Sequence, residues 1–594
     1  MKIIYSLFLI LFIKTSFGDV SSTWTYSFDA SSTVGNPLKG FVPYYYGTNS
    51  QPTVNFPHSM ENQYFAMKSL MLGPNSFDFS AIETVLVNVA NRNHHAIVRV
   101  YVDYPGRNLS ISLPDFLWNG LTIYSGGSDQ GFFPDYNNET LINAIVTLIH
   151  ALGQKYDGDN RIGFWQVGFL GHWGEWHTYP NASNFASTAY QNQILSAFNS
   201  SFTKTKFQLR YFHVTGENNA TSWNVGFHDD SFFQDTYGEA WMFYERSISL
   251  TTIHSSQPIG GEVRPELMLC VFANDPVTAC QTITTLKPLN WSTCVQLTHS
   301  SYQWLSYAFN NPGFSGSDYD RAINGSIMQG YSFFVSEITA KEITCSGTSH
   351  VVRVGVTMSN VGVAPFYYPL MLNTKAVDTT TGSSISSKSI SVPIVNQLDQ
   401  KAFVYYFDMM VNTNTTIQFS TWLSSPHLVG NQTIVFAISG ASATGVIQLP
   451  AISIGSCATL SVSAACTSYI ADTKANGTQV RLINFQRSLS KGLRYKWLIC
   501  DGDSSTYDRE NAANGSLVYN LRRHLAVRRS IKLGINTSSY RKKKHASQQV
   551  PTINTERCAE IDKPYDKNAL VNDDIEDEYI VIYDDVEEEQ VGRC

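Results

Sequence analysis

The residues best suited to chemistry are two glutamates far apart in the 594-residue sequence, Glu175 and Glu262. Glu175 stands in the block Gly171 to His177, which reads Gly-His-Trp-Gly-Glu-Trp-His. Its aromatic and imidazole neighbours in that block are His172, Trp173, Trp176 and His177. Cleavage of a glycosidic bond requires two carboxyl groups on either side of the bond, one protonated and the other ionised. Glu175 and Glu262 could supply that pair.

Each of these residues also has a purely structural interpretation. A glutamate beside tryptophans can accept a hydrogen bond from an indole N–H, and a glutamate after Gly260-Gly261 can cap a turn. Tryptophans pack in cores more often than they bind sugars, although two beside one glutamate favour a sugar platform. His172 and His177 lack the His-Glu-x-x-His spacing of a zinc site, so we expect no metal. No nucleotide-binding fingerprint occurs in a suitable context, so we expect no cofactor.

An apolar run, Ile162 to Leu170, leads directly into this block and is typical of a strand buried on both faces. Elsewhere, short apolar runs alternate with segments of helical periodicity, such as Ser80 to Val89 and Leu141 to Leu152. This alternation predicts parallel strands joined by crossover helices. About eight such units over roughly 300 residues predict an α/β fold, a (β/α)8 TIM barrel. The predicted strands are 36–46 with its loop, 64–72, 96–102, 162–170, 207–214, 225–227, 257–262 and 294–299.

In such a barrel, ligand-binding residues project from the carboxyl ends of the strands. The residues at the predicted strand ends are rich in carboxylates and rings and poor in lysine, which suits neutral, hydroxyl-rich ligands better than phosphates. We therefore expect a carbohydrate substrate or ligand. The residues expected to bind it, besides the two glutamates, are His172, Trp173, Trp176, His177, Tyr44, Asp103 and Asp230. Further residues at predicted strand ends are His213, Asp229 and His299.

The pattern changes after residue 330. Helical periodicity disappears, and short alternating runs separated by Gly, Asn, Ser and Pro predict a small all-β sandwich over 331–460. Residues 461–594 carry a basic cluster followed by an acidic one, with little apolar periodicity, and we expect a disordered tail there. The predicted division is therefore a signal peptide at 1–18, the barrel at 19–330, the sandwich, and the tail.

The N-terminus and the composition indicate secretion. Lys2 precedes the uncharged apolar run Ile3 to Ile13, and the small residues Ser16 and Gly18 follow, as in a cleaved signal peptide. Twelve Asn-x-Ser/Thr acceptor sites fit an extracellular glycoprotein. No later stretch is apolar enough to span a bilayer, so we expect no membrane association after signal removal. The net charge of −7 argues against nucleic-acid binding by the chain as a whole.

Nine cysteines in an oxidising compartment should be partly paired. We expect Cys280 to pair with Cys294, and Cys345 to pair with Cys457 or Cys466. The odd count leaves at least one thiol over, for which Cys594 and Cys558 are candidates. No Cys-x-x-Cys pair occurs, which argues against a zinc site.

Three segments resemble a family of secreted proteins catalogued only as a domain of unknown function. They are Asn36 to Phe41 (Asn-Pro-Leu-Lys-Gly-Phe), Gly168 to His177, and Asn360 to Tyr367 (Asn-Val-Gly-Val-Ala-Pro-Phe-Tyr). The resemblance covers roughly Trp24 to Gly455, and its most specific part is the block around Glu175. It implies a glycoside-hydrolase-like barrel followed by a small β-sandwich, whereas activity is implied only by analogy of fold.

The same resemblance implies roles for the two glutamates. In retaining glycosidase barrels the acid/base ends strand four and the nucleophile ends strand seven, and these places match Glu175 and Glu262. One departure is that Gly174 stands where those enzymes have an asparagine that binds the sugar 2-hydroxyl, so His172 or Asp230 would have to replace it. The leading hypothesis is a secreted glycoside hydrolase acting on a polysaccharide or glycan. The alternatives are a non-catalytic carbohydrate-binding barrel and a structural extracellular protein.

Overall fold

The computed structural model describes residues 21–47, 52–126, 131–210, 223–239, 242–249, 252–412 and 415–455. These residues belong to one compact unit, Phe17–Cys457. The predicted signal peptide, the charged region 461–594 and His213 lie outside the described residues. Within the described part of the chain, no helix is both long and apolar enough to cross a membrane.

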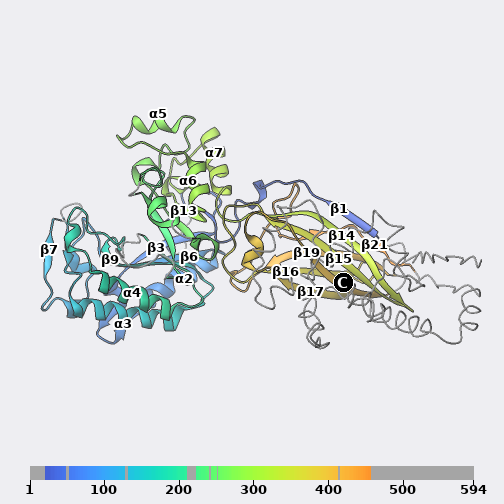
Figure 1. The fold of residues 1–594 in the computed structure, drawn as a ribbon, viewed down its shortest axis with the longest axis horizontal. Helices are drawn as coiled ribbons and strands as arrows, with labels where there is room; N and C mark the ends of the chain where they lie inside the picture. Colours follow the sequence, from blue (N-terminus) through green and yellow to red (C-terminus); the bar gives the residue numbers. More distant parts are fainter. Residues whose placement is uncertain are drawn as a thin grey trace, which may run out of the picture. The chain divides into compact units, whose positions relative to one another are not determined.

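Eight parallel strands form the predicted barrel and follow one another around it in chain order (Figure 1). They are β2 (Gly40–Val42), β3 (Met60–Ala66), β6 (His95–Asp103), β9 (Ile162–His172), β10 (Phe207–Leu209), β11 (Gly226–Phe232), β12 (Ile259–Val263) and β13 (Tyr302–Trp304). A parallel bridge between Tyr44 and Asn62 links the β2 end of the sheet to β3 and brings the ring nearly to closure. The fold is therefore a (β/α)8 TIM barrel, with all carboxyl strand ends at one mouth.

Helices cover the outside of this barrel. They are α1 (Met67–Leu70), α2 (Ser80–Asn91), α3 (Glu139–Tyr156), α4 (Thr188–Ser201), α5 (Pro276–Gln281), α6 (Trp291–Thr298) and α7 (Gly316–Ile327). On α2 the buried residues Ile82, Val85, Leu86 and Val89 are those whose spacing predicted the helix. Asn138 caps α3, since its Oδ1 accepts the Leu141 N–H at 3.1 Å. Two hairpins, β4 (Met71–Gly73) with β5 (Ser76–Phe77) and β7 (Ile123–Ser125) with β8 (Phe132–Pro134), extend the loops after β3 and β6.

The eighth strand was predicted at 294–299, and this prediction is wrong because those residues lie in and just after α6. Asn290 caps that helix by accepting the Thr293 N–H at 2.9 Å, and His299 ends it in the left-handed region at φ 53°. The real strand is β13, three residues further on. Three residues are too few to show an alternating pattern, so the sequence carried no signal for it.

A β-sandwich follows the barrel, as predicted. One sheet contains β1 (Ser21–Thr25), β14 (Phe333–Ser346), β15 (Ser349–Asn360) and β18 (Phe403–Asn412). The other contains β16 (Met371–Asp378), β17 (Ser384–Ser391), β19 (Thr416–Ser424), β20 (Ile447–Gln448) and β21 (Ile452–Ser453). The alternation in β18 buries Tyr405, Phe407, Met409 and Val411. Within the predicted sandwich range, the apolar stretch 433–438 forms only single bridges, at Ile434 and Ile438.

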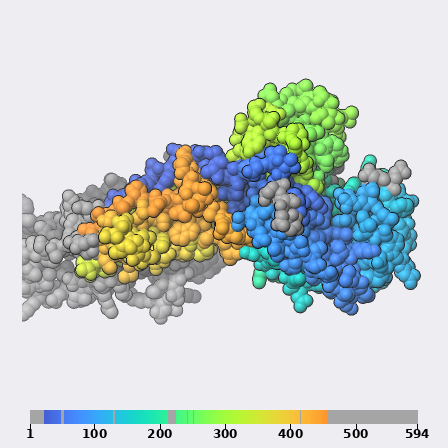
Figure 2. Space-filling model, turned by 180° about the vertical axis from the view of Figure 1, so that it is seen from behind, coloured from blue at the N-terminus to red at the C-terminus, as the bar shows by residue number. Residues whose placement is uncertain are grey.

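The N-terminal strand β1 joins the sandwich and not the barrel. It pairs antiparallel with β14, with Ser21 opposite Lys341. The chain then runs along the sandwich, where the Asn36 amide donates to Val435 O at 2.9 Å, before it enters β2. Figure 2 shows this dark blue segment beside the yellow and orange sandwich strands. The predicted domain boundaries stay a prediction. The strand β1 shows that the start of the chain also contributes to the sandwich.

The sandwich closes the amino end of the barrel, which we call the floor. One apolar cluster contains both barrel residues, such as Met60, Ile97 and Phe164, and residues of the sandwich core. Hydrogen bonds cross the same boundary, from Tyr368 Oη to Gly163 O at 2.5 Å and from His427 Nε2 to Ile162 O at 2.9 Å. The described residues thus pack together at the floor, and we expect a ligand to enter from the opposite end, the mouth.

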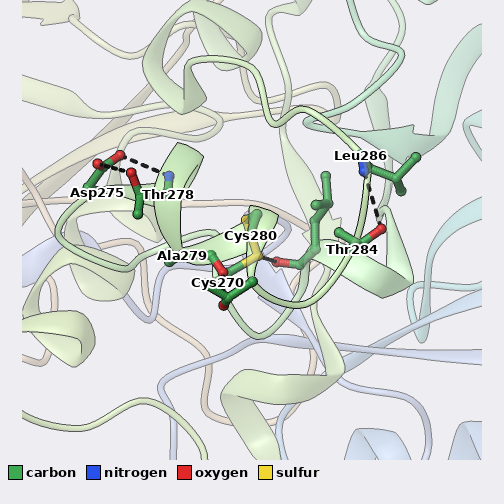
Figure 3. The surroundings of a disulfide bond; sticks show 9 residues. Cys270, Asp275, Thr278, Ala279, Cys280, Thr284 and Leu286 are labelled. Atoms are coloured by element: carbon green, nitrogen blue, oxygen red, sulfur yellow. Dashed lines mark hydrogen bonds between the residues drawn. A yellow bond between two sulfur atoms is a disulfide. The ribbon is translucent and has the colours of Figure 1, made fainter.

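One disulfide joins Cys270 to Cys280, just before and within the short helix α5 (Figure 3). The predicted pair of Cys280 with Cys294 is therefore wrong: Cys294 is a free, buried thiol on α6. The reason is local, since the turn into α5 brings Cys270 within 5.2 Å of Cys280 between Cα atoms. Cys345 is also disulfide-bonded, and both of its predicted partners lie outside the described residues.

Candidate active site

The block after β9 folds back on the end of its own strand. His172 N–H donates to His177 O at 2.9 Å, and Trp176 N–H donates to Leu170 O at 2.9 Å. Glu175 N–H donates to His172 O at 2.8 Å, which closes the turn inside these two bonds. The result is a tight, hydrogen-bonded loop at the barrel mouth that carries the Glu175 side chain.

This loop is built from backbone conformations that most residues avoid. Trp173 and Trp176 have φ angles of 56° and 60°, and Gly171 and Gly174 have φ angles of 79° and 74°. Only glycine fits at 171, because a Cβ there would lie 2.4 Å from His177 O. Non-glycine residues in this region cost free energy, and such strain gathers at functional sites. The positions of the two glycines in this block therefore follow from the backbone conformation of the turn.

Two arginines and one histidine surround the Glu175 carboxylate. Arg99 Nη1 lies 3.5 Å away, His177 Nε2 lies 3.5 Å away and Arg210 Nε lies 3.9 Å away. The two arginines come from β6 and from the residue after β10, and both are buried. The Glu175 side chain keeps 16% of its surface exposed. It is therefore a reachable carboxylate in a positive environment.

Behind Glu175 lies a buried charge network centred on Asp230 of β11. Arg99 Nη2 donates to Asp230 Oδ2 at 2.6 Å, and His228 Nδ1 contacts Asp230 Oδ1 at 2.9 Å. Burial alone would raise the pKa of Asp230, but the charge of Arg99 and the contact with His228 hold it well below its usual value. Burial also lowers the pKa of His228 to about 4, so the ring is a neutral donor to a carboxylate.

Glu262 of β12 faces the same mouth in the opposite electrostatic environment. Burial raises its pKa well above the usual value, and the charges of Asp230 and Glu175 raise it further. Arg99 and Arg210 oppose this shift only in part. Among the described residues, no cation comes within the 4.0 Å of an ion pair with this carboxyl group. The two carboxyl groups at the mouth therefore differ in their surroundings, because only Glu175 has arginine side chains within ion-pair distance.

Aromatic rings line the mouth. The Arg99 guanidinium lies 4.3 Å from the centroid of Tyr64, and Tyr44 packs against Trp304 at 5.4 Å between ring centroids. Trp173 meets Tyr104 edge-on at 6.4 Å. Tyr44, Trp173 and Trp304 all keep part of their surface exposed. Rings with exposed faces beside fixed charges suit a ligand that has apolar faces and many hydroxyl groups.

The structure brings together five of the residues predicted for the site: Glu175, Glu262, Asp230, His177 and Tyr44 lie at or next to the mouth. Trp173 stands beside them in the loop and is partly exposed. The prediction for Trp176 is wrong, because its side chain is fully buried in the core and its Nε1 donates to Gly168 O at 2.9 Å. Trp176 is therefore a packing residue, and of these two tryptophans only Trp173 is exposed enough to contact a ligand.

The predictions that Asp103 and His172 bind substrate are also contradicted. Both side chains are about 1% exposed, and His172 Nδ1 contacts Asp103 Oδ1 at 3.0 Å. The other oxygen, Asp103 Oδ2, accepts a 2.6 Å hydrogen bond from Tyr136 Oη. The pair joins the end of β6 to the end of β9 below the surface. These residues therefore hold the Glu175 loop in place.

Several mouth residues were missed in the sequence: Arg99, Arg210, His228, Tyr64 and Trp304. Arg99 had a visible signal, since it is the one charged residue within the otherwise apolar run from Ala96 to Val102. An unpaired charge would be very costly in a buried strand, so such a residue must face partners inside the barrel. Arg210 had no comparable signal, because the strand that precedes it, β10, is only three residues long.

Two groups of side chains outside the mouth have metal-ligand types close together. In the first, the Glu61 carboxylate is already bound by Arg92 Nη2 at 2.6 Å and His94 Nδ1 at 2.9 Å, and the guanidinium would repel a cation. In the second, which consists of Glu342, Cys345 and His350, the cysteine is consumed in a disulfide. Neither group argues for a metal site.

Comparisons with known proteins add little beyond the fold. No family model and no characterised protein matches the chain. Endo-glycoceramidase II from Rhodococcus sp., in complex with a five-membered iminocyclitol, is 10% identical with a TM-score of 0.34, over 64% of this chain and 97% of that one. Endoglucanase Cel5A from Pseudomonas stutzeri is 8% identical with a TM-score of 0.27, over 45% and 81%. Likeness at this level says nothing about activity.

Proposed function

We propose that this protein is a secreted glycoside hydrolase that cleaves glycosidic bonds in a polysaccharide or glycan. The observation that carries the proposal is the pair Glu175 and Glu262. They reach one barrel mouth from the ends of the fourth and seventh strands, where Arg99 and Arg210 flank Glu175 and burial raises the pKa of Glu262. A two-carboxylate mechanism needs such a difference between its two groups.

The lining of the mouth supports a carbohydrate as the substrate. Exposed faces of Trp173, Trp304 and Tyr44 can stack on sugar rings, and the rim of the charge network can bind hydroxyl groups. The buried arginines are engaged with Asp229, Asp230 and Glu175, so they offer little to an additional phosphate. A neutral sugar chain therefore fits this mouth better than a phosphorylated ligand.

Secretion is part of the same proposal and rests mainly on the sequence of the first 18 residues. The surface adds support, because seven acceptor asparagines fall within the described residues and none of them is buried: Asn108, Asn138, Asn181, Asn199, Asn290, Asn324 and Asn431. Oligosaccharide transfer requires an accessible asparagine. Expression in a eukaryotic secretory host, followed by glycosidase treatment and N-terminal sequencing of the medium protein, would check both features.

The activity is tested by screening secreted protein against aryl-glycosides and polysaccharides, with Glu175→Gln and Glu262→Gln beside the wild type. Each substitution should reduce turnover by at least about 100-fold, since each removes a group that acts in the transition state. Glu337→Gln on β14 is a matched control in the sandwich and should behave like the wild type. Equal turnover by the wild type and both active-site variants would refute the assignment.

A second candidate function is carbohydrate binding without cleavage. It is favoured by Gly174, which occupies the position where retaining glycosidases have an asparagine. Glycan binding that is lost in Trp173→Ala but kept in Glu262→Gln, with no turnover of any bound glycan, would favour this alternative over hydrolysis.

A further inference from the structure

We propose that the outer face of the sandwich sheet formed by β1, β14, β15 and β18 is a second carbohydrate-binding surface, separate from the barrel mouth. It holds an uncharged polysaccharide chain against the exposed ring of Tyr406. This inference goes beyond the proposed hydrolase function, because it concerns binding by the sandwich and holds equally for a barrel without activity.

The side chain of Tyr406 points away from the sandwich core. On β18 the alternate residues Tyr405, Phe407 and Met409 are buried between the two sheets, so Tyr406 lies on the solvent side. It keeps 56% of its surface exposed. Single exposed apolar residues are common on protein surfaces. The neighbours of Tyr406 therefore decide what its ring can do.

A glycine on the next strand makes room for the ring. Gly355 of β15 stands directly opposite Tyr406, and Thr339 of β14 stands opposite Gly355 on its other side. A Cβ at Gly355 would lie 3.0 Å from Cε1 of Tyr406 and 2.8 Å from Oγ1 of Thr339. The ring thus lies across the place where a side chain of β15 would stand. Tyr406 forms a flat platform on the sheet, with a hydroxyl group beside it.

Hydrogen-bonding groups are fixed next to this platform. Arg353 Nε and Nη2 donate to Asp408 Oδ1 and Oδ2 at 2.7 and 3.0 Å, and the Arg353 guanidinium lies 5.5 Å from the centroid of the Tyr406 ring. Lys341 stands opposite Arg353 on β14 and is exposed. An exposed ring with donors and acceptors at its edge matches a sugar, which has apolar faces bordered by hydroxyl groups.

The charge and the shape of the face favour an uncharged polymer. Asp408 neutralises Arg353, the cation beside the ring, so this face offers little attraction to a polyanion. The row through Tyr406 continues with Gly355, Thr339 and Thr23, which are small or polar, and is not the apolar patch that a protein partner requires. Four strands about 4.8 Å apart present an open surface roughly 14 Å across. Such a surface suits an extended chain better than a small molecule, which needs a concave pocket.

Retention of the full secreted protein on insoluble polysaccharides tests the proposal. Cellulose, chitin and a β-1,3-glucan serve as probes, in about 0.5 M NaCl so that exposed charges are screened. The wild type should bind at least one of them. Tyr406→Ala should weaken that binding at least about 10-fold, whereas Tyr406→Phe, which keeps the ring, should bind like the wild type. Val87→Ala, at an exposed apolar residue on α2 of the barrel, is the matched control and should also bind normally.

Gly355→Ala tests the platform without removing the ring. The added methyl group would meet the Tyr406 ring at 3.0 Å, so the ring must tilt away from the sheet. Because Gly355 lies within the regular strand β15, alanine brings no left-handed backbone strain there. Retention should fall although the tyrosine is present. Retention equal to that of the wild type would overturn the platform geometry. Thermal unfolding of each variant checks that it folds.

Other outcomes would overturn the binding surface itself. Retention that is lost in Trp173→Ala but kept in Tyr406→Ala would place the polysaccharide at the mouth. Retention that appears only at low salt would indicate an anionic ligand held through Lys341. A second copy of this chain is the competing occupant, since β18 also exposes Val404 and Met410. Sedimentation would reveal it as a dimer that Tyr406→Ala converts to a monomer, with no retention on any probe. These measurements follow binding and not cleavage, so failure of the hydrolase proposal would leave their result intact.

Discussion

The mouth and the floor of the barrel both bury polar side chains, but they satisfy them in different ways. At the mouth, charged groups face one another: Arg99 contacts Asp230 at 2.6 Å and Glu175 at 3.5 Å. At the floor, several buried side chains instead meet backbone carbonyls. Lys39 Nζ, for example, donates to Tyr331 O at 2.7 Å and to Ile327 O at 3.1 Å.

This contrast separates function from architecture. Lys39 can be replaced without removing the partner of a charged neighbour, because it donates to uncharged carbonyl groups. At the mouth, every charge alters the next one, as the opposite surroundings of Glu175 and Glu262 illustrate. Networks of this kind cost stability when one member is lost and are retained where chemistry requires them. Substitutions at the two ends should therefore differ in both size and pH dependence.

The largest effect is expected for Arg99→Met. It removes the nearer of the two arginines that Asp230 and Glu175 share in a buried site, which should cost about 3–5 kcal/mol in the free energy of unfolding. Urea titration would measure it. Arg353→Met is the control, because Arg353 also pairs with a carboxylate, that of Asp408, but on the sandwich surface. There the cost should stay below about 1 kcal/mol. Equal costs for the two variants would contradict the proposed difference between buried and exposed networks.

A mouth residue could be predicted from the sequence only where the surrounding pattern indicates which way its side chain points. Glu175 comes shortly after the apolar run Ile162 to Leu170, and Glu262 ends the short segment 257–262, so their place at strand ends was predictable. Trp173 and Trp176 were not separable in this way. Whether a tryptophan of this motif is buried in the core or exposed at the mouth depends on the turn that carries it. In this turn Gly171 has a left-handed backbone conformation, which the residue types alone do not reveal.

The next largest effect is expected at that turn, for Gly171→Ala. An added Cβ would lie 2.4 Å from His177 O, so the loop must shift and carry Glu175 with it. Gly106→Ala is the matched control, since its φ of 76° is nearly the same and nothing lies within 4 Å of its Cβ. Both variants should pay about 1–2 kcal/mol for the left-handed backbone. The clash should lower the free energy of unfolding of Gly171→Ala by about 1–3 kcal/mol more, which unfolding titrations would measure. The variant should also lose turnover, which kinetics would measure. Equal stability of the two variants would show that the loop yields without strain.

The fold was more predictable than the site, and its failures have a common cause. Long periodic segments such as α2 and β18 could be predicted because apolar residues recur at many positions on one face of the element. The three-residue strand β13 and the pairing of Cys270 with Cys280 depend on single turns, which periodicity does not describe. The contact between sandwich and floor was likewise not predictable, because it joins residues from opposite ends of the described chain.

At the floor, the first test is the pH dependence contributed by Lys39. Burial lowers the pKa of this lysine to about 7, against 10.5 in the unfolded chain. Between these values the unfolded chain holds a proton that the folded chain has lost, so stability should rise with pH by about 1.4 kcal/mol per unit. Lys39→Met should abolish this rise. Urea midpoints at pH 6.5 and 9 would show it, and Lys401→Met, at an exposed lysine, should leave the rise intact. An unchanged rise in Lys39→Met would mean that another group causes it.

The smallest effect is expected for His427→Gln and runs in the acidic range. Burial lowers the pKa of His427 to about 4, against 6.5 in the unfolded chain. As pH falls from 6.5 to about 4, the unfolded chain gains a proton that the folded chain refuses, so stability drops by about 1.4 kcal/mol per unit. Glutamine at this position does not titrate, so the slope should become shallower by that amount in urea titrations across this range. His150→Gln, at an exposed histidine on α3, should keep the wild-type slope. The ring of His427 hydrogen-bonds to the carbonyl of Ile162 at the floor, so this change should not alter the pH profile of turnover at the mouth. A shift of both pH profiles in His427→Gln would show that the two ends of the barrel are electrostatically coupled.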